Sequence, residues 1–223
     1  MEDEIAEACR RAGRNPSEIV LVAVSKTVDP ARVAEAIRAG VSDVGENWVQ
    51  EALPKRPAVE QFEPRRVHWH MIGHLQTNKV KKALEVFDLV QGVDSLHLAQ
   101  ELNRRAAQAG RFLPVLLEVN TSGEASKFGV APEGLAALGE AVRELAHLRL
   151  EGLMTIGPGL SVEDPEKSRP CFRRLHDLRG QLERELGLKL PVLSMGMSSD
   201  YAVAIEEGST MLRIGTAIFG GRQ

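Results

Sequence analysis

The amino-acid sequence predicts an α/β fold in one domain, a (β/α)8 barrel of the TIM type with parallel strands. Strand-like and helix-like segments alternate throughout the chain, and no run of consecutive hairpins interrupts them. A chain of 223 residues can bury a full core, and barrels of this size fold as single units. No low-complexity segment, short repeat or change of composition marks a boundary, so residues 1–223 are expected to form one domain. An open doubly wound sheet is the alternative.

Composition and charge argue against several classes of protein. The formal net charge of −3 gives no basic surface for nucleic acid. Cys9 and Cys171 lie far apart without the spacing of metal ligands, which is typical of a reducing compartment. The chain starts with an acidic segment where a signal peptide would be basic, and no apolar run approaches the length of a membrane span. We therefore expect a soluble, cytoplasmic protein with no nucleic-acid or membrane partner.

The segment Val20–Thr27 predicts the first strand and a candidate reactive residue. It is apolar and β-branched up to Ser25, which suits a strand covered on both faces, and it then reaches Lys26. Asp29 and Pro30 open the next helical pattern, so Lys26 lies in a strand-to-helix loop. A lysine in an apolar mouth is easier to deprotonate and can attack a carbonyl to form a Schiff base. The alternative is an ion-paired or snorkelling lysine at a strand end.

The first half of the chain is divided by clear helix ends and by prolines. Gly13 ends the first helix and Gly40 the second, whereas Pro54, Pro57 and Pro64 predict an irregular connection before the third strand. The expected strands are 20–25, 41–46, 67–73 and 89–93, and the expected helices are 2–13, 30–40, a segment through Val49 and Leu53, and 76–84.

The second half repeats this alternation with longer helices and two notable loops. A loop of small residues at 121–129 follows the fifth strand, and a loop with two prolines at 157–165 follows the sixth. The expected strands are 113–120, 148–156, 192–197 and 211–214, and the expected helices are 96–109, 132–145, 168–186 and 199–207.

Polar side chains gather at the carboxyl ends of the expected strands, where the active sites of such barrels lie. The positions are Lys26 after the first strand, Gly45 to Asn47 after the second, His70 and Gly73 on the third, Gly196 to Asp200 after the seventh, and Arg213 to Thr216 after the eighth.

The loops after the seventh and eighth strands predict a phosphate site, because these two loops form it in many barrels. Ser198 and Ser199 stand where hydroxyl groups can cap the following helix. Gly215 allows the backbone to approach a ligand, Thr216 adds a hydroxyl, and residues 217–219 are a candidate short extra helix. The alternative is ordinary helix capping and a turn glycine.

Arg213 alternates with Met211 and Gly215, so it points either into the barrel or toward the helix layer. An arginine inside an apolar barrel needs a partner. A lysine, a phosphate cradle and an inward cation together suggest pyridoxal 5′-phosphate (PLP), with Arg213 facing the pyridine nitrogen. The alternative partner of Arg213 is Glu46 or another carboxylate.

Two further groups of residues have weaker functional interpretations. His68 and His70 share one strand face and could form a metal cluster with His74, but no acidic or cysteine ligand follows at a suitable spacing. We favour His70 as a pocket wall or hydrogen-bond donor, the other two histidines as surface residues, and no metal site. Lys127, in the small-residue loop, is a minor candidate for a second ligand site and more often a solvated lysine.

Six segments at the expected strand ends carry a resemblance to a known family. They are AVSKT at 23–27, GENWVQE at 45–51, WHMIGHLQTNK at 69–79, GLM at 152–154, LSMGMSSD at 193–200 and RIGTAIFG at 213–220. Together they resemble the pyridoxal phosphate homeostasis protein family (YggS-like, also PROSC), whose fold is related to the amino-terminal barrel of alanine racemase. The resemblance implies that Lys26 carries PLP as a Schiff base, that Ser198, Gly215 and Thr216 bind phosphate, and that Arg213 faces the ring nitrogen.

Three more residues complete the expected cofactor-binding set at the strand ends: Asn47, His70 and Met197. Trp48 and Ser199 depart from the family pattern, in which other aromatic or acidic residues are common, and we see no consequence for binding. The resemblance implies a monomer that buffers PLP or delivers it to PLP-dependent apoenzymes, with no established turnover.

The alternative function is a PLP-dependent racemase or related enzyme. Racemases of the related fold have a separate β domain and a tyrosine base supplied across a dimer, whereas this sequence ends at Gln223 shortly after the last strand and its only tyrosine is Tyr201. A metal-dependent barrel hydrolase is a more distant third.

Overall fold

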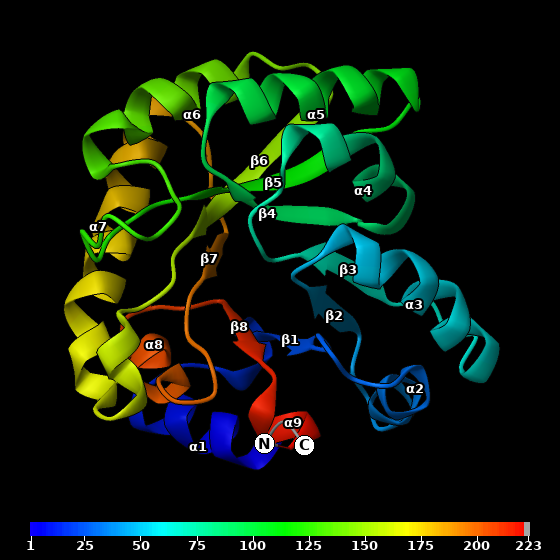
Figure 1. Cartoon of the computed structure of the whole chain (residues 1–223). Coiled ribbons are helices and arrows are strands. Elements are labelled where there is room, and N and C mark those ends of the chain that lie inside the picture. Colours follow the sequence, from blue (N-terminus) through cyan, green and yellow to red (C-terminus); the bar gives the residue numbers. More distant parts are fainter. Residues whose placement is uncertain (221–223) are drawn as a thin grey trace.

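Eight parallel strands close into one barrel in chain order, and β8 pairs back with β1. The computed structural model describes residues 1–220, and in Figure 1 the helices surround the strands. The predicted (β/α)8 barrel is confirmed and the open sheet is wrong, since the β1–β8 ladder joins Val20 to Met211 and Val22 to Arg213. The strands are β1 Val20–Val24, β2 Asp43–Glu46, β3 His68–Met71, β4 Leu89–Val93, β5 Leu113–Glu118, β6 Leu148–Met154, β7 Val192–Ser194 and β8 Met211–Ile214.

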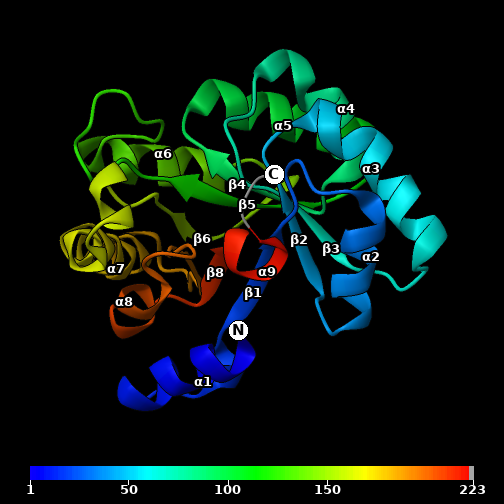
Figure 2. The same cartoon turned by 60° about the horizontal axis from the view of Figure 1, so that its bottom comes forward.

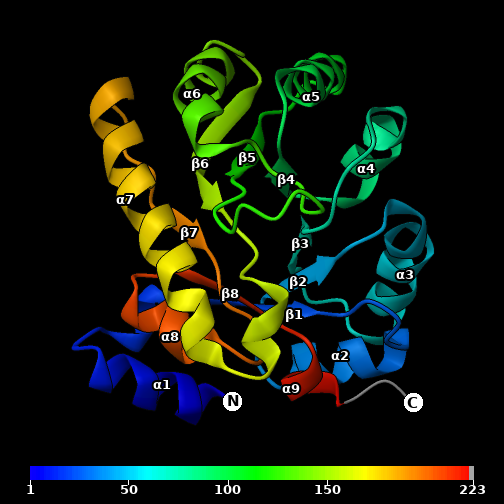
Figure 3. The same cartoon turned by 60° about the vertical axis from the view of Figure 1, so that its left-hand side comes forward.

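The helices form the outer layer of the barrel, with neighbouring helices side by side in Figures 1 and 3. In the described part of the chain, no helix combines the length and the apolar character needed to cross a membrane. The α-helices are α1 Glu2–Arg11, α2 Pro30–Arg38, α3 Val49–Phe62, α4 Val80–Val86, α5 Leu96–Gln108, α6 Leu135–Arg143, α7 Arg169–Leu186, α8 Tyr201–Glu206 and α9 Thr216–Phe219. Short 3-10 turns cover Pro16–Glu18, Thr77–Lys79, Pro132–Gly134, Gly159–Val162 and Pro165–Ser168.

The predicted irregular connection around Pro54 is wrong, because α3 continues through Pro54 and Pro57 to Phe62. Each proline removes one hydrogen bond from the helical ladder, and its ring crowds the carbonyl four residues earlier. The face of α3 that carries Ala52 and Val59 is buried against the barrel, and this packing outweighs both costs. The continuous helix matters for the site, because it brings the side chain of one of its residues, described below, under the loop of Lys26.

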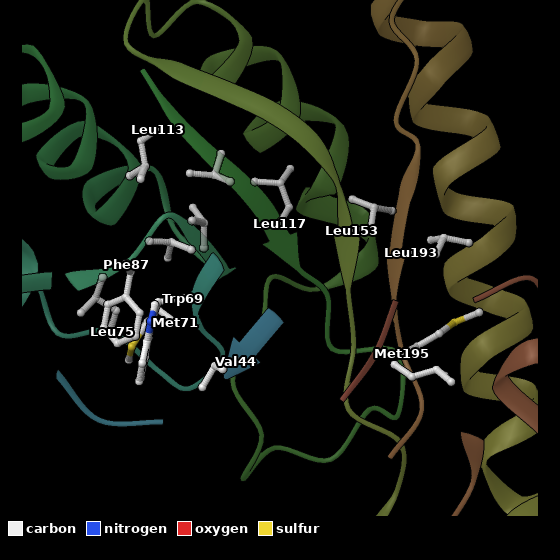
Figure 4. Close-up of a cluster of buried hydrophobic side chains, with 14 of the residues drawn as sticks. Val44, Trp69, Met71, Leu75, Phe87, Leu113, Leu117, Leu153, Leu193 and Met195 are labelled. Carbon is white, nitrogen blue, oxygen red and sulfur yellow. The ribbon is translucent and has the colours of Figure 1, made fainter. Parts of the chain in front are cut away.

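The main hydrophobic core lies between the strands and the helices. Figure 4 shows part of this core, where side chains such as Trp69, Leu117 and Leu193 project from the outer face of their strands. A second, small cluster of Leu89, Leu116 and Met154 lies apart from it. Burial of apolar side chains at about 25 cal/mol per Å² is the dominant stabilising term in such a core. Both faces of the strands are therefore covered, as their sequences predict.

Candidate functional site

A cavity of about 620 Å³ lies at the carboxyl ends of the strands. Its volume is within the range of about 300–1,000 Å³ that is usual for small-molecule sites. Apolar side chains such as Ile72 and Ile156 alternate with polar groups around it. The structure brings seven of the predicted cofactor-binding residues to this one cavity: Lys26, Asn47, Met197, Ser198, Arg213, Gly215 and Thr216.

Lys26 is the second residue after β1 and is half-buried at the junction of two cavities. The second cavity, of about 490 Å³, also contacts Arg32 and Phe219. Helix α9 lies beside the ends of β8 and β1 in Figures 2 and 3, so the eighth strand returns the chain to the first at this point. Lys26 and Thr216 thus line both cavities although they lie at opposite ends of the sequence.

Arg213 points into the barrel and is 4% exposed. Its Nη1 donates to Ser194 Oγ at 2.6 Å and its Nη2 donates to the Thr155 carbonyl at 2.8 Å. Burial lowers the pKa of Arg213 to about 10, against the opposing effect of Glu118 and Asp200, so the guanidinium remains charged at neutral pH. The alternative partner Glu46 is wrong, because that carboxylate pairs with Lys55 at 2.6 Å instead.

The guanidinium of Arg213 is one end of a series of side-chain hydrogen bonds that crosses the barrel. The sequence did not reveal this series. Ser194 Oγ donates to Gln91 Oε1 at 2.6 Å, and Gln91 Nε2 lies 3.0 Å from His70 Nδ1. His70 Nε2 lies 2.9 Å from Asp43 Oδ1. Because the Gln91 amide nitrogen can only donate, Nδ1 of His70 accepts from it, and Nε2 is then the ring nitrogen that donates to Asp43. A glutamine inside the apolar strand β4 is the one feature of the sequence that could have indicated this series of hydrogen bonds.

His70 is therefore buried within this series of hydrogen bonds and is not among the residues that line the cavity. The predicted role as a hydrogen-bond donor fits its contact with Asp43. His68 is exposed, whereas His74 is half-buried and stacks on Phe128 with the ring centroids 3.9 Å apart. Within residues 1–220, no three His, Cys, Asp or Glu side chains come together in a way that could hold a metal ion.

The loop after β7 differs from its prediction, because Ser198 does not cap the following helix. Helix α8 starts at Tyr201, and Asp200 occupies the N-cap position. Asp200 Oδ1 accepts from the Met197 amide at 2.7 Å, and Oδ2 accepts from Ser168 Oγ at 2.7 Å. The carboxylate closes the turn, so Ser198 remains available to line the cavity.

The loop after β8 contains the predicted short extra helix, which is α9. Gly215 lines the cavity and also packs closely against β1, since a Cβ at this position would lie 3.3 Å from the Val24 carbonyl oxygen. A glycine at this position therefore serves the β1–β8 contact in addition to any ligand. Thr216 follows at the first position of α9 and lines both cavities.

Lys127 lies in a separate small cavity of about 130 Å³, together with Glu118 and Phe128. Its Nζ donates to the Gly157 carbonyl at 2.5 Å and pairs with Glu124 Oε1 at 2.9 Å. The side chain is thus partnered by the protein itself. Whether it also forms a second ligand site stays a prediction.

Glu118, at the end of β5, is a titratable residue that the sequence did not single out. Its side chain is 4% exposed, and burial raises its pKa to about 7, with Asp94 raising it further and Arg213 lowering it. The carboxyl group therefore keeps its proton in the folded protein at a pH where an exposed glutamate is ionised. The inward face of β5 could have indicated this residue, because it follows Leu116 by two positions.

We expect Glu118→Gln to stabilise the protein at pH 8 but not at pH 4. Below the ordinary pKa of 4.5 both states of the wild type hold the proton, so the residue contributes nothing to pH dependence. As the pH rises to about 7 the unfolded chain ionises first, and the wild type loses stability. A change of one in pKa corresponds to about 1.4 kcal/mol, so the gain at pH 8 is about 3 kcal/mol.

Denaturant unfolding of both proteins at the two pH values measures this difference. Glu140→Gln, on the exposed face of α6, is the matched control and should change little at either pH. An equal effect of Glu118→Gln at pH 4 and pH 8 would contradict the raised pKa.

The fold and the cavity together define a class of protein: a (β/α)8 barrel with a lysine in the loop after its first strand, facing a cavity bounded by the loops of the last two strands. A family model described as "Alanine racemase, N-terminal domain" matches residues 2–223. A pyridoxal phosphate homeostasis protein of Aquifex aeolicus (strain VF5) is 46% identical over 221 residues, which cover 99% of this chain and 95% of that protein.

Two solved structures are also similar. One is an unknown protein from Bifidobacterium adolescentis, with a TM-score of 0.91, 38% identity, and coverage of 98% of this chain and 91% of that one. The other is PipY of Synechococcus elongatus PCC7942 with PLP bound, with a TM-score of 0.83, 36% identity, and coverage of 97% and 100%. The chain belongs to the pyridoxal phosphate homeostasis protein family, within the barrel class of the alanine racemase amino-terminal domain.

Proposed function

We propose that this protein binds PLP, holds it as a Schiff base on Lys26, and acts in PLP homeostasis by buffering the cofactor or delivering it to apoenzymes. One observation carries the proposal: Lys26, three hydroxyl residues (Ser198, Ser199 and Thr216) and the buried Arg213 line one cavity. We further propose that it acts as a cytoplasmic monomer without turnover. The family membership and the PLP-bound structure of PipY support the cofactor assignment.

The residues of the cavity suit the chemical parts of PLP. Ser198 and Thr216 offer hydroxyl donors to a phosphate, and Gly215 leaves the backbone between them accessible. Arg213 offers a cationic donor from a fixed position, because two of its nitrogens are already bonded to the barrel. When bound, PLP supplies an aldehyde that an amine can capture and a ring that accepts electrons. Asn47 and Met197 would contact the ring or its substituents.

The absorption spectrum of the purified protein tests the proposal most directly. A Schiff base between PLP and a lysine colours a protein yellow, so we expect a visible absorption band after addition of PLP and gel filtration. A colourless protein that releases all of its PLP on gel filtration would contradict the proposal.

We expect Thr216→Val and Ser198→Ala to weaken PLP binding while hardly changing the affinity for unphosphorylated pyridoxal. Each substitution removes a hydroxyl donor, and a hydrogen bond to a charged group contributes about 1.5–3 kcal/mol. The dissociation constant for PLP should therefore rise about tenfold or more in each variant. Titration with both ligands separates the two explanations, because equal losses for PLP and pyridoxal would indicate structural damage instead.

A further inference from the structure

A buried cluster of ionic side chains lies behind the loop of Lys26. Lys55 of α3 is 6% exposed, and its ammonium group donates to three oxygens. They are the Ser25 carbonyl at 2.7 Å, Glu46 Oε1 at 2.6 Å and Glu51 Oε1 at 2.8 Å. All three protons of the ammonium group therefore have an acceptor. None of these side chains lines the cavity.

The same cluster holds the peptide groups on both sides of Lys26. On one side the Ser25 carbonyl accepts from Lys55, and Ser25 Oγ donates to Glu46 Oε1 at 2.6 Å. On the other side the Thr27 amide donates to Glu51 Oε1. The positions before and after the lysine are thus fixed by side chains from β2 and α3.

Thr27 needs such support because of its backbone conformation. Its φ angle is +62°, and within residues 1–220 it is the one residue other than glycine with a positive φ. A β-branched residue is a strong outlier in this region, because its side chain crowds its own backbone. The turn therefore persists only if its surroundings hold it, and such strained residues are frequent at functional sites.

We propose that Lys55, Glu46 and Glu51 form a clamp that holds Thr27 in the left-handed conformation and thereby directs Lys26 into the cavity. They are positioning residues, since none of them contacts the cavity. The inference rests on the proposed function, in which the Lys26 amine adds to an aldehyde and gives an imine and one molecule of water. The clamp supplies no proton to this step and acts through the geometry of the amine.

The energetics of burial support a positioning role over a purely stabilising one. A buried ion pair gains little over well-packed apolar side chains, because both charges lose their hydration. Burial indeed raises the pKa of Glu46 although Lys55 and Ser25 both donate to it. Lys55 is also a poor candidate for the reactive lysine itself, since its three protons are engaged and it does not line the cavity.

The first test compares Glu51→Ala with Glu51→Gln and with Glu60→Ala. Glutamine keeps an oxygen that can accept from the Thr27 amide, whereas alanine does not. Glu60 is the matched control, because it pairs with Arg56 at 3.0 Å on the same helix but on an exposed face. We expect Glu51→Ala to speed hydrogen exchange of the Thr27 amide and to slow Schiff base formation with PLP, each by about tenfold or more. Glu51→Gln should lose much less, and Glu60→Ala nothing.

A ligand without an aldehyde shows whether the cavity itself survives. Pyridoxine 5′-phosphate has the ring and the phosphate but cannot form an imine, so its affinity should change by less than about twofold in Glu51→Ala. A parallel loss of its affinity would indicate general damage and would overturn the positioning role.

The second test adds Thr27→Gly to Glu51→Ala. Glycine adopts a positive φ without steric cost, so it removes the need for the clamp at this position. We expect the double variant to form the Schiff base faster than Glu51→Ala alone, although it carries an additional substitution. A double variant that is as slow as Glu51→Ala, or slower, would overturn the inference.

Failure of the proposed function can be distinguished from failure of the clamp. If wild-type Lys26 takes no PLP, the proposed function fails, but exchange of the Thr27 amide and acetylation of Lys26 by acetic anhydride still report the loop in the ligand-free protein. If both are unchanged in Glu51→Ala, the clamp is wrong even though the wild type binds PLP.

Discussion

Borohydride reduction of the protein with PLP is expected to fix a phosphopyridoxyl group on Lys26, and Lys26→Ala should lose this label completely. Reduction converts a Schiff base to a stable amine, so peptide mapping reports the lysine that held the aldehyde. Lys26 is the one lysine among the residues that line the cavity of about 620 Å³ in the described part of the chain. The expected effect is the largest of all our predictions, because no other side chain of that cavity can form an imine.

Two lysines serve as controls for the labelling. Lys127→Ala should leave the label on Lys26 in place, because Lys127 lies in a different cavity and donates to the Gly157 carbonyl. Lys55 should remain unlabelled in the wild type, since it is buried and engaged by carboxylates. A label on another peptide, or its survival in Lys26→Ala, would remove the central premise of the proposed function.

The barrel and much of the cavity could be predicted from the sequence for a physical reason. Parallel strands in a closed barrel present their carboxyl ends to one side, so residues at those ends converge whatever their separation in the sequence. Lys26 after β1 and Thr216 after β8 illustrate this, since β1 and β8 are neighbours in the closed sheet. Recognising the strands was therefore sufficient to predict that Lys26 and Thr216 lie close together.

The parts that were missed depend on contacts that strand recognition does not provide. The position of Lys55 under Ser25 requires α3 to continue past Pro54, and the prolines argued against that. The bonds that join Arg213 to Ser194 cross the barrel interior, where partners are set by register and side-chain length. Helix α8 starts later than the serines predict, because the Asp200 carboxylate closes the preceding turn through bonds to the Met197 amide and Ser168.

Slow racemisation of amino acids is the second large effect that we expect, and Arg213 is its first cause. A carboxylate beside the pyridine nitrogen of PLP keeps that nitrogen protonated and makes the ring a strong electron acceptor. Arginine can only donate, and Arg213 is held by Ser194 and Thr155 so that it remains in the barrel. A neutral ring nitrogen is a weaker electron acceptor, which raises the barrier to removal of the α-proton of an amino acid.

A racemase of this class compensates with two bases on opposite faces of the substrate, and this cavity offers one. Within the described residues its lining holds Lys26 and Arg213 as the only ionisable side chains. Tyr201 does not line it. Burial raises the pKa of its hydroxyl, Glu4 of α1 raises it further and Arg11 of α1 lowers it, so the side chain lies toward α1. Glu118 lines the smaller cavity beside Lys127.

We therefore expect the protein loaded with PLP to racemise alanine and serine only slowly. A positioned general acid or base contributes about 10²–10⁴-fold to such a step, and the described residues that line the cavity include no second base. Single enantiomers incubated in heavy water give two measurements, loss of optical rotation and gain of deuterium at the α-carbon, with Lys26→Ala as the blank. Deuterium gain without loss of rotation would indicate one working base, as expected for Lys26. Rapid loss of rotation that disappears in Lys26→Ala would contradict the carrier function and favour a racemase, because a single base cannot readily return the proton to the opposite face.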